Sequence, residues 1–233
     1  MSAIQQVMLW VSAWIPRNWL VAEYLLANNS NDTSGNGNNG TDTSMSYSWS
    51  EATFNGSSSI VSLPNTSIIK PTWVFSFSWW VNIQNNAAAG TYPTIVQSYS
   101  QSWTVAGFVI YQTPSDHPSN PNCLRFIVWK NTWFTLWTDY VEAFSPLTVT
   151  WGSWYFFYAE YNWSNISIRV NSTNWTTVSW SSWLAYNTTT YALFWASNHT
   201  WSHFWYLNWK VKKARLYNRV LNAAEIAALY ADS

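Results

Sequence analysis

The chain has 233 residues, a length that a single β-sandwich domain can reach. Only 9% of its residues are charged, and 10 Lys and Arg balance 10 Asp and Glu, so there is no basic field to hold nucleic acid. The single cysteine, Cys123, excludes an internal disulfide. No apolar run reaches the roughly 18 residues of a membrane helix, and we expect no membrane insertion.

We expect residues 1–18 to form a short N-terminal leader and residues 19–233 to form one domain. The leader has no positively charged stretch before its apolar residues, so it does not match a secretory signal. Its residues Ser2 to Leu9 resemble the short leaders of some phage structural proteins. We therefore expect an extracellular location, on a cell surface or a virion.

Residues 28–48 are rich in Asn, Ser, Thr and Gly, which predicts a loop. Short segments of alternating hydrophobicity follow this loop. In the clearest segment, Ile166, Ile168 and Val170 point one way, and Ser167 and Arg169 point the other. The predicted strands are 74–83, 94–99, 105–112, 124–129, 133–142, 154–161, 166–171, 176–180, 191–196 and 205–218. Many short strands separated by turns predict an all-β fold, a two-sheet antiparallel jelly-roll sandwich.

The end of the chain predicts a short helix instead. Asn222 and Glu225 have the spacing of a capping box. Ile226, Leu229 and Tyr230 then recur at helical spacing, which predicts an apolar stripe packed on the sandwich.

Tryptophan is unusually frequent, with 21 Trp and only 7 Gly, where an average chain of this length has about 16 Gly. Trp19, Trp163, Trp175 and Trp209 each follow an asparagine between apolar runs. Hairpin turns favour Asn-Gly at such places, because the second turn residue takes a positive φ. The pattern predicts that most Trp stand where the organism inserts glycine at UGA codons, with Trp80 and Trp154 as original tryptophans. The alternative is a tryptophan-rich surface that stacks on sugars.

Several stretches together resemble a known family of domains. They are Leu20–Leu26, Asn31–Thr41, Phe75–Val81, Gly152–Tyr155, Asn165–Asn171, Asn208–Arg219 and Leu221–Ile226. In this order they are similar to laminin-G-like, concanavalin A-like lectin/glucanase domains over about residues 19–230. The resemblance implies a two-sheet jelly roll that binds glycans or protein partners at a loop rim, sometimes through calcium. Family glycines match Trp19, Trp151, Trp163 and Trp209, which agrees with recoding.

Basic residues gather near the end of the chain, at Lys210, Lys212, Lys213, Arg215 and Arg219. One interpretation is a solvated strand edge that resists edge-to-edge pairing. The other is a small basic patch for an acidic glycan. The family often carries acidic residues on this strand, and Lys212 and Lys213 stand there instead.

Catalytic and metal-binding patterns are weak. Glycosidases place two carboxylates about 5–10 Å apart, but the glutamates here are scattered singly, and Glu160 is the best candidate. His199 and His203 fall where the sequence predicts a turn, without neighbouring ligands for zinc. No cofactor is expected. A calcium ion could use Asp32 in an oxygen-rich loop, although an Asx turn also explains that residue.

These observations predict a non-catalytic module that binds a glycan or another cell-surface partner for adhesion, through loops at one rim. The candidate ligand contacts are Tyr111, Asp116, His117, Asn120 and Asn122, in and beside a long polar loop. The first alternative is a structural or assembly domain that makes protein–protein contacts. The second alternative is a glycan hydrolase. Neither the ligand nor the oligomeric state follows from the sequence.

Overall fold

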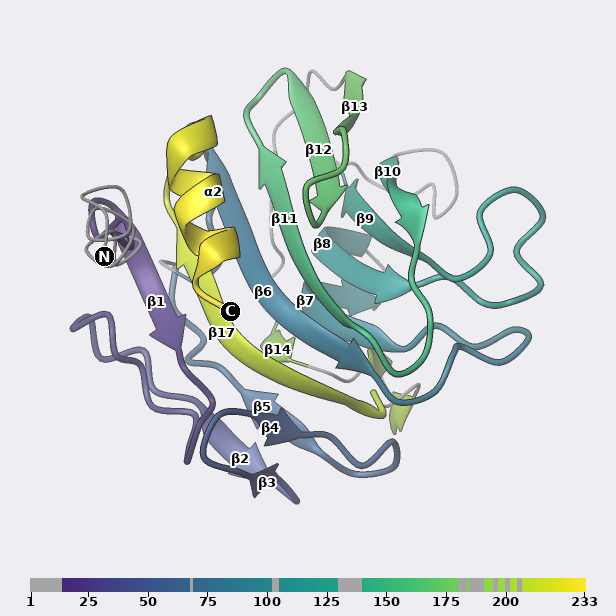
Figure 1. Ribbon diagram of the computed structural model, residues 1–233, viewed down its shortest axis with the longest axis horizontal. Helices are drawn as coiled ribbons and strands as arrows, with labels where there is room; N and C mark the ends of the chain where they lie inside the picture. The colour runs from purple at the N-terminus through teal and green to yellow at the C-terminus, as the bar shows by residue number, and fades with distance from the viewer. Residues whose placement is uncertain are drawn as a thin grey trace, which may run out of the picture.

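Two antiparallel sheets pack face to face in the computed structural model, which confirms the predicted jelly-roll sandwich (Figure 1). The structure describes residues 14–67, 69–101, 105–129, 140–179, 184, 191–194, 197–199, 202–204 and 207–233. None of the helices in these ranges is long and apolar enough to cross a membrane.

The first sheet has eight strands, in the order β13-β12-β11-β6-β17-β4-β3, with β1 also paired to β17. Its strands are β1 (Leu20–Tyr24), β3 (Ser46–Tyr47), β4 (Ala52–Thr53), β6 (Phe75–Ile83), β11 (Trp154–Tyr161), β12 (Asn165–Val170), β13 (Thr176–Ser179) and β17 (Trp209–Tyr217).

The second sheet has seven strands, in the order β10-β9-β8-β7-β14-β5-β2. Its strands are β2 (Thr41–Thr43), β5 (Ile60–Ser62), β7 (Thr94–Gln101), β8 (Val105–Gln112), β9 (Cys123–Trp129), β10 (Tyr140–Thr148) and β14 (Tyr191–Phe194). A separate hairpin joins β15 (Ser197–His199) and β16 (Ser202–Phe204).

Most predicted strands are confirmed, and β8 and β11 have the predicted bounds. The prediction of a loop over 28–48 is wrong in part, because β2 and β3 lie inside it. Both are short, and their residues are polar and exposed except for the half-buried Tyr47. They therefore lack apolar alternation and form by pairing with β5 and β4. The strand predicted at 133–142 lies largely outside the described residues, and β10 runs on to Thr148.

Alternation along the strands places the core between the sheets. On β6, Phe75, Phe77 and Trp79 point inward, as predicted, and their rings contact Phe108 of β8 and Phe157 of β11. The inward residues of β12, Ile166, Ile168 and Val170, are also confirmed in this core.

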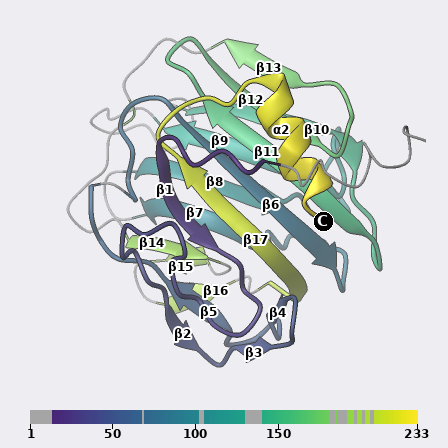
Figure 2. The ribbon, with the colours of Figure 1, turned by 60° about the vertical axis from the view of Figure 1, so that its left-hand side comes forward.

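Helix α2 (Ala223–Ala231) covers the outer face of the eight-stranded sheet (Figure 2). The predicted capping box is present: the Glu225 amide donates to Asn222 Oδ1 (3.0 Å), and the Asn222 amide donates to the Glu225 carboxylate (2.9 Å). Ile226 and Leu229 are buried on this face, and the Tyr230 ring stacks on Trp80 at 5.6 Å. The predicted apolar stripe is confirmed.

The tryptophans that follow asparagines divide into two groups. Trp19 and Trp163 have φ values of 61° and 72°, in the left-handed region. The prediction of a turn at Trp209 is wrong, because this residue begins β17 and is fully buried (0% exposed) in the core. Between β12 and β13 the left-handed residue is Asn171, rather than Trp175. Trp79, another position interpreted as recoded, is also buried.

The predicted boundary between leader and domain falls inside a packed segment. Residues 1–13 lie outside the described ranges. Ile15 packs against the cluster under α2, and Arg17 forms an ion pair with Glu23 of β1 (2.7 Å). Residues 15–18 therefore contact the sandwich.

Candidate ligand-binding rim

Five connections meet at one end of the sandwich, and we call this end the rim. They are residues 54–59 between β4 and β5, 84–93 between β6 and β7, 113–122 between β8 and β9, 149–153 between β10 and β11, and 207–208 before β17. Backbone hydrogen bonds join them. The Gly56 amide donates to the Leu207 carbonyl (2.9 Å), and the Gln84 amide donates to the Asn208 carbonyl (3.2 Å). The rim is therefore a connected surface and not a set of independent loops.

A hollow of about 340 Å³ opens in the rim between three of these connections. It is lined by residues 55–56, 85–88, 91, 93 and 208–209. Its size is at the lower end of the roughly 300–1,000 Å³ of typical ligand pockets. Among the described residues, the lining consists of asparagines, a threonine, a glycine and apolar residues, and it includes no ionisable side chain.

Three asparagine amides of the hollow are available to a ligand. Asn85 and Asn86 are exposed and Asn208 is half-buried, and none of the three side chains hydrogen-bonds to any residue that the structure describes. Asn55 differs, since its Oδ1 accepts the backbone amides of Ser57 and Ser58, both at 2.9 Å. These three asparagines were not predicted as ligand contacts from the sequence. The only sequence signal for them was the polar run that directly follows β6.

The predicted binding loop, 113–122, adjoins the hollow. Asp116 Oδ1 accepts the Gly90 amide (3.1 Å), and the Ser115 amide donates to the Ala87 carbonyl (3.2 Å). Both contacts tie the loop to residues 84–93, which form one wall of the hollow. The structure therefore places the predicted loop on the rim, beside the hollow.

Within that loop, His117 and Asn120 interact with each other. His117 Nδ1 accepts the Asn120 amide (3.1 Å). Burial lowers the pKa of His117, and the Arg125 charge lowers it further, although Asp116 raises it. His117 is therefore neutral at pH 7, as its accepting Nδ1 requires. Asn122 has a φ of 55°, and its buried Oδ1 accepts no hydrogen bond from the residues that the structure describes.

Tyr111 lies on the outer face of the seven-stranded sheet, in the same aromatic cluster as His117, whose ring lies 5.3 Å from that of Phe144. It is only 8% exposed. The guanidinium of Arg125 donates to its hydroxyl and forms an ion pair with Glu142. The same guanidinium lies 5.5 Å from the Tyr111 ring, 5.8 Å from Tyr140 and 5.3 Å from Phe144. Tyr111 thus belongs to an aromatic cluster closed around an arginine and offers little surface to a ligand.

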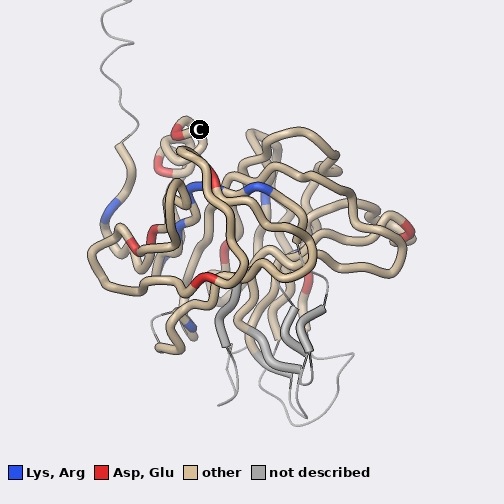
Figure 3. Tube along the Cα trace, turned by 90° about the horizontal axis from the view of Figure 1, so that it is seen from below, with Lys and Arg blue, Asp and Glu red and all other residues tan. Residues whose placement is uncertain are grey.

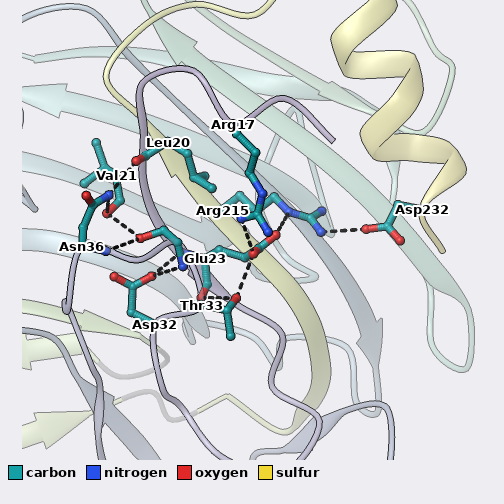
Figure 4. Close-up of polar contacts among 10 residues, drawn as sticks. Arg17, Leu20, Val21, Glu23, Asp32, Thr33, Asn36, Arg215 and Asp232 are labelled. Carbon is teal, nitrogen blue, oxygen red and sulfur yellow. Dashed lines mark hydrogen bonds and ion pairs between the residues drawn. The ribbon is translucent and has the colours of Figure 1, made fainter. Parts of the chain in front are cut away.

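Asp32, the candidate calcium ligand, organises the loop after β1. Its Oδ1 accepts the Glu23 amide at 2.9 Å (Figure 4). Oδ1 also accepts the Ser34 amide, and Oδ2 accepts the Asn38 amide, both at 2.9 Å. The bond from Ser34 is the Asx turn that the sequence analysis gave as the alternative. The described residues contain no group of three or more His, Cys, Asp or Glu that could hold a metal ion. Calcium at Asp32 stays a prediction.

The basic residues of β17 form neither a strand edge nor a free patch. β17 is an interior strand, with β6 on one side and β1 and β4 on the other. The pairs are Lys210 with Glu51, Lys213 with Asp232, Arg215 with Glu23 and Asp232, and Arg219 with Glu225, at 2.6–2.8 Å. Lys212 Nζ lies 4.5 Å from the Trp154 ring. The interpretation as an edge was wrong, because it assigned an unpaired side to a strand that has neighbours on both. Positive and negative positions are interspersed along the chain (Figure 3).

Glu160, the best catalytic candidate, lies on the outer face of β11. Its partners in register are Ser76 of β6 and Ser167 of β12. None of the outward residues on the described strands β6, β11 and β12 is a second carboxylate. Burial raises the pKa of Glu160 to about 7, although a hydrogen bond with Tyr158 lowers this pKa in part. The paired carboxylates of a glycosidase are therefore not assembled around this residue.

The remaining chemical candidates are a thiol and two histidines. Cys123 is buried, and burial raises the pKa of its thiol. His199 and His203 lie on β15 and β16, whereas the sequence predicted a turn around them. A hairpin this short has too few residues to show alternation.

No protein-family model and no curated protein sequence matches the chain. Solved structures match it at low sequence identity. The binding domain of botulinum neurotoxin DC in complex with SialylT has 15% identity and a TM-score of 0.66, and it covers 93% of this chain and 52% of that one. A mutant Trypanosoma rangeli sialidase displaying trans-sialidase activity has 13% identity and a TM-score of 0.65, covering 93% and 33%.

Domain 4 of a GH43 extracellular arabinanase from Geobacillus stearothermophilus, in complex with arabinotriose, has 14% identity and a TM-score of 0.66. It covers 91% of this chain and 98% of that domain. The chain thus spans about half the length of the neurotoxin binding domain and nearly the whole arabinanase domain. At these identities the likeness is one of fold, and the fold is the β-sandwich that these domains share.

Proposed function

We propose that this chain is a non-catalytic module that binds a glycan at its rim. The observation that carries the proposal is the hollow, with its three asparagine amides available to a ligand. An amide side chain offers donors and an acceptor together, and each sugar hydroxyl also donates and accepts. A few convergent polar groups in a concave site are typical of ligand pockets.

Two of the similar structures are complexes with a ligand, and the ligands support this function. One binding domain is in complex with SialylT and one arabinanase domain is in complex with arabinotriose. The position of Glu160 supports the non-catalytic part, because its neighbours in register are serines. The resemblance to laminin-G-like domains extends the proposal to adhesion, on a bacterial surface or a virion.

A glycan array tests the proposal, with the intact chain as probe. We expect binding to a defined group of glycans, weakened in the variant Asn208→Ala. Asn218→Ala is the matched control, because Asn218 is an exposed asparagine at the other end of β17. A blank array would contradict glycan binding. A blank array together with ordered self-association would favour the assembly function.

We also propose that Trp19 and Trp163 are glycines in the organism that makes the protein, through recoded UGA codons. Their left-handed φ values support this, because a side chain costs about 1–2 kcal/mol in that region. The buried Trp79 and Trp209 lend no such support. Mass spectrometry of peptides from the native protein tests the proposal. Glycine at positions 19 and 163 would support it, and tryptophan at both would refute it.

A further inference from the structure

We infer that the hollow receives an uncharged saccharide unit and rejects an acidic one. This inference rests on the proposed glycan-binding function and names the ligand class of the same site. It follows from three features of the described residues: the chemistry of the lining, the rigidity of the walls and the pairing of the nearby charges.

The lining offers neutral hydrogen-bonding groups only. Asn85, Asn86 and Asn208 present amides, Thr91 adds a hydroxyl, and Pro93 adds an apolar surface. The carboxylate of an acidic sugar is best held by an arginine, which can donate two parallel hydrogen bonds. In the part of the chain that the structure describes, no lysine or arginine lines the hollow. An acidic unit would therefore lose water without gaining a charged partner.

The walls of the hollow are held in place before any ligand arrives. Gly56 has a φ of 75°, and a Cβ built on it would lie 2.9 Å from Asn208 Cβ. The backbone bonds from Gly56 to Leu207 and from Phe54 to Trp209, both 2.9 Å, fix the two segments together. This close approach fixes the backbone of Asn208 in the lining, and a preformed site loses less entropy on binding.

The charges around the hollow are already paired. Lys210, the residue after Trp209, lies 2.7 Å from the carboxylate of Glu51. The carboxylate of Asp116 lies outside the lining, where it accepts the Gly90 amide. Lys210 therefore offers no unpaired cation to an acidic unit in the hollow.

Isothermal titration with two sets of oligosaccharides tests this inference. The neutral set consists of arabino-, xylo-, cello- and malto-oligosaccharides, and the acidic set consists of sialyllactose and oligogalacturonates. We expect a neutral oligosaccharide to bind with an affinity that is insensitive to salt. Asn208→Ala and Asn85→Ala should each weaken this binding by about tenfold, the size of one lost hydrogen bond. Asn218→Ala should leave the affinity unchanged.

The possible results separate the two proposals. Binding of acidic oligosaccharides alone, lost at high salt, would overturn the uncharged ligand and leave glycan binding in place. If neutral oligosaccharides bind both asparagine variants as tightly as the parent chain, the binding site is not the hollow. This result would also overturn the inference. Failure of every oligosaccharide would refute the proposed function itself. Unchanged melting temperatures would show that the variants are folded.

Discussion

Arg215 Nε donates to the carboxylate of Glu23 over 2.8 Å, although 192 positions separate the two residues in the sequence (Figure 4). Both side chains are buried, with 3% and 4% of their surface exposed. The pair joins β1 to β17, and Asp232 extends it to the end of α2. The first and last elements of the domain are therefore held by one buried ionic network.

Glu23→Gln should lower the free energy of unfolding by about 3 kcal/mol, because it leaves the buried guanidinium with only part of its countercharge. Urea denaturation measures this loss. The control is Glu51→Gln, which removes the partly exposed pair with Lys210 and should cost less than about 1 kcal/mol. Equal losses for the two variants would contradict the buried network as a source of stability.

The same network sets the response to acid. Burial alone would raise the pKa of Glu23, but hydrogen bonds from Arg215, Thr33 and Arg17 outweigh it and hold that pKa below its usual value. A depressed folded-state pKa stabilises the protein above the unfolded pKa, and this stability is lost as the pH falls. The Glu23→Gln variant should lose less stability than the parent chain below about pH 4.5. Parallel curves of unfolding free energy against pH would argue against this origin.

Glu160 should have the opposite pH dependence. Its pKa is raised by burial to about 7, so the folded state holds a proton that the unfolded state has released between about pH 4.5 and pH 7. This contribution is present at low pH and is lost as the pH rises through 7. Glu160→Gln should therefore stabilise the chain at pH 8 by up to about 3 kcal/mol and change little at pH 4. Denaturant titrations at the two pH values measure the difference, and a pH-independent effect would refute the shift.

Trp19→Gly should stabilise the fold by up to about 1 kcal/mol. Glycine removes the cost of about 1–2 kcal/mol for a side chain at φ 61°, and part of this gain is offset by the greater freedom of the unfolded chain. Trp49→Gly is the control, because Trp49 is the most exposed of the tryptophans that the structure describes and has no left-handed φ. Thermal unfolding should show the first variant gaining stability and the second losing a little. A loss in both would contradict strain at position 19.

Gly56→Ala should cost more than Gly35→Ala. Both glycines have positive φ values, but only Gly56 faces a neighbour, since its added Cβ would lie 2.9 Å from Asn208, whereas Gly35 has nothing within 4 Å. We expect a loss of about 2 kcal/mol or more at Gly56 and about 1 kcal/mol at Gly35. Only the Gly56 variant should also weaken glycan binding, because it moves the wall that carries Asn208. Equal effects would show that the wall is not tightly packed.

The sandwich could be predicted from the sequence where period-two alternation is strong. β8 and β11 have the predicted bounds, and the capping box locates α2 because its signal is local. β2 and β3 were missed because their residues are polar and their partners decide their conformation. Trp209 was misplaced because a preceding asparagine resembles a turn signal, whereas burial between the sheets controls the residue.

The sequence allowed the loop at the rim to be predicted, but not the side chains that line the hollow. The polar loop around Asp116 and His117 is on it, as expected. Tyr111 is not a rim residue, because strand alternation turns it to the outer face beside Arg125. Asn208 lies far in sequence from Asn85, and only the pairing of β17 with β6 brings them to one hollow. No local pattern encodes such a contact.

Backbone amide chemical shifts, followed by NMR during titration with a neutral oligosaccharide that binds, test the central claim most directly. We expect the largest shifts at residues 55–56, 85–93 and 208, with smaller ones in the 113–122 loop. The amides of β1 and α2, far from the rim, should be unchanged. Saturable shifts centred instead on the outer face of β9 and β10, with none around Asn208, would contradict the rim as the glycan-binding site.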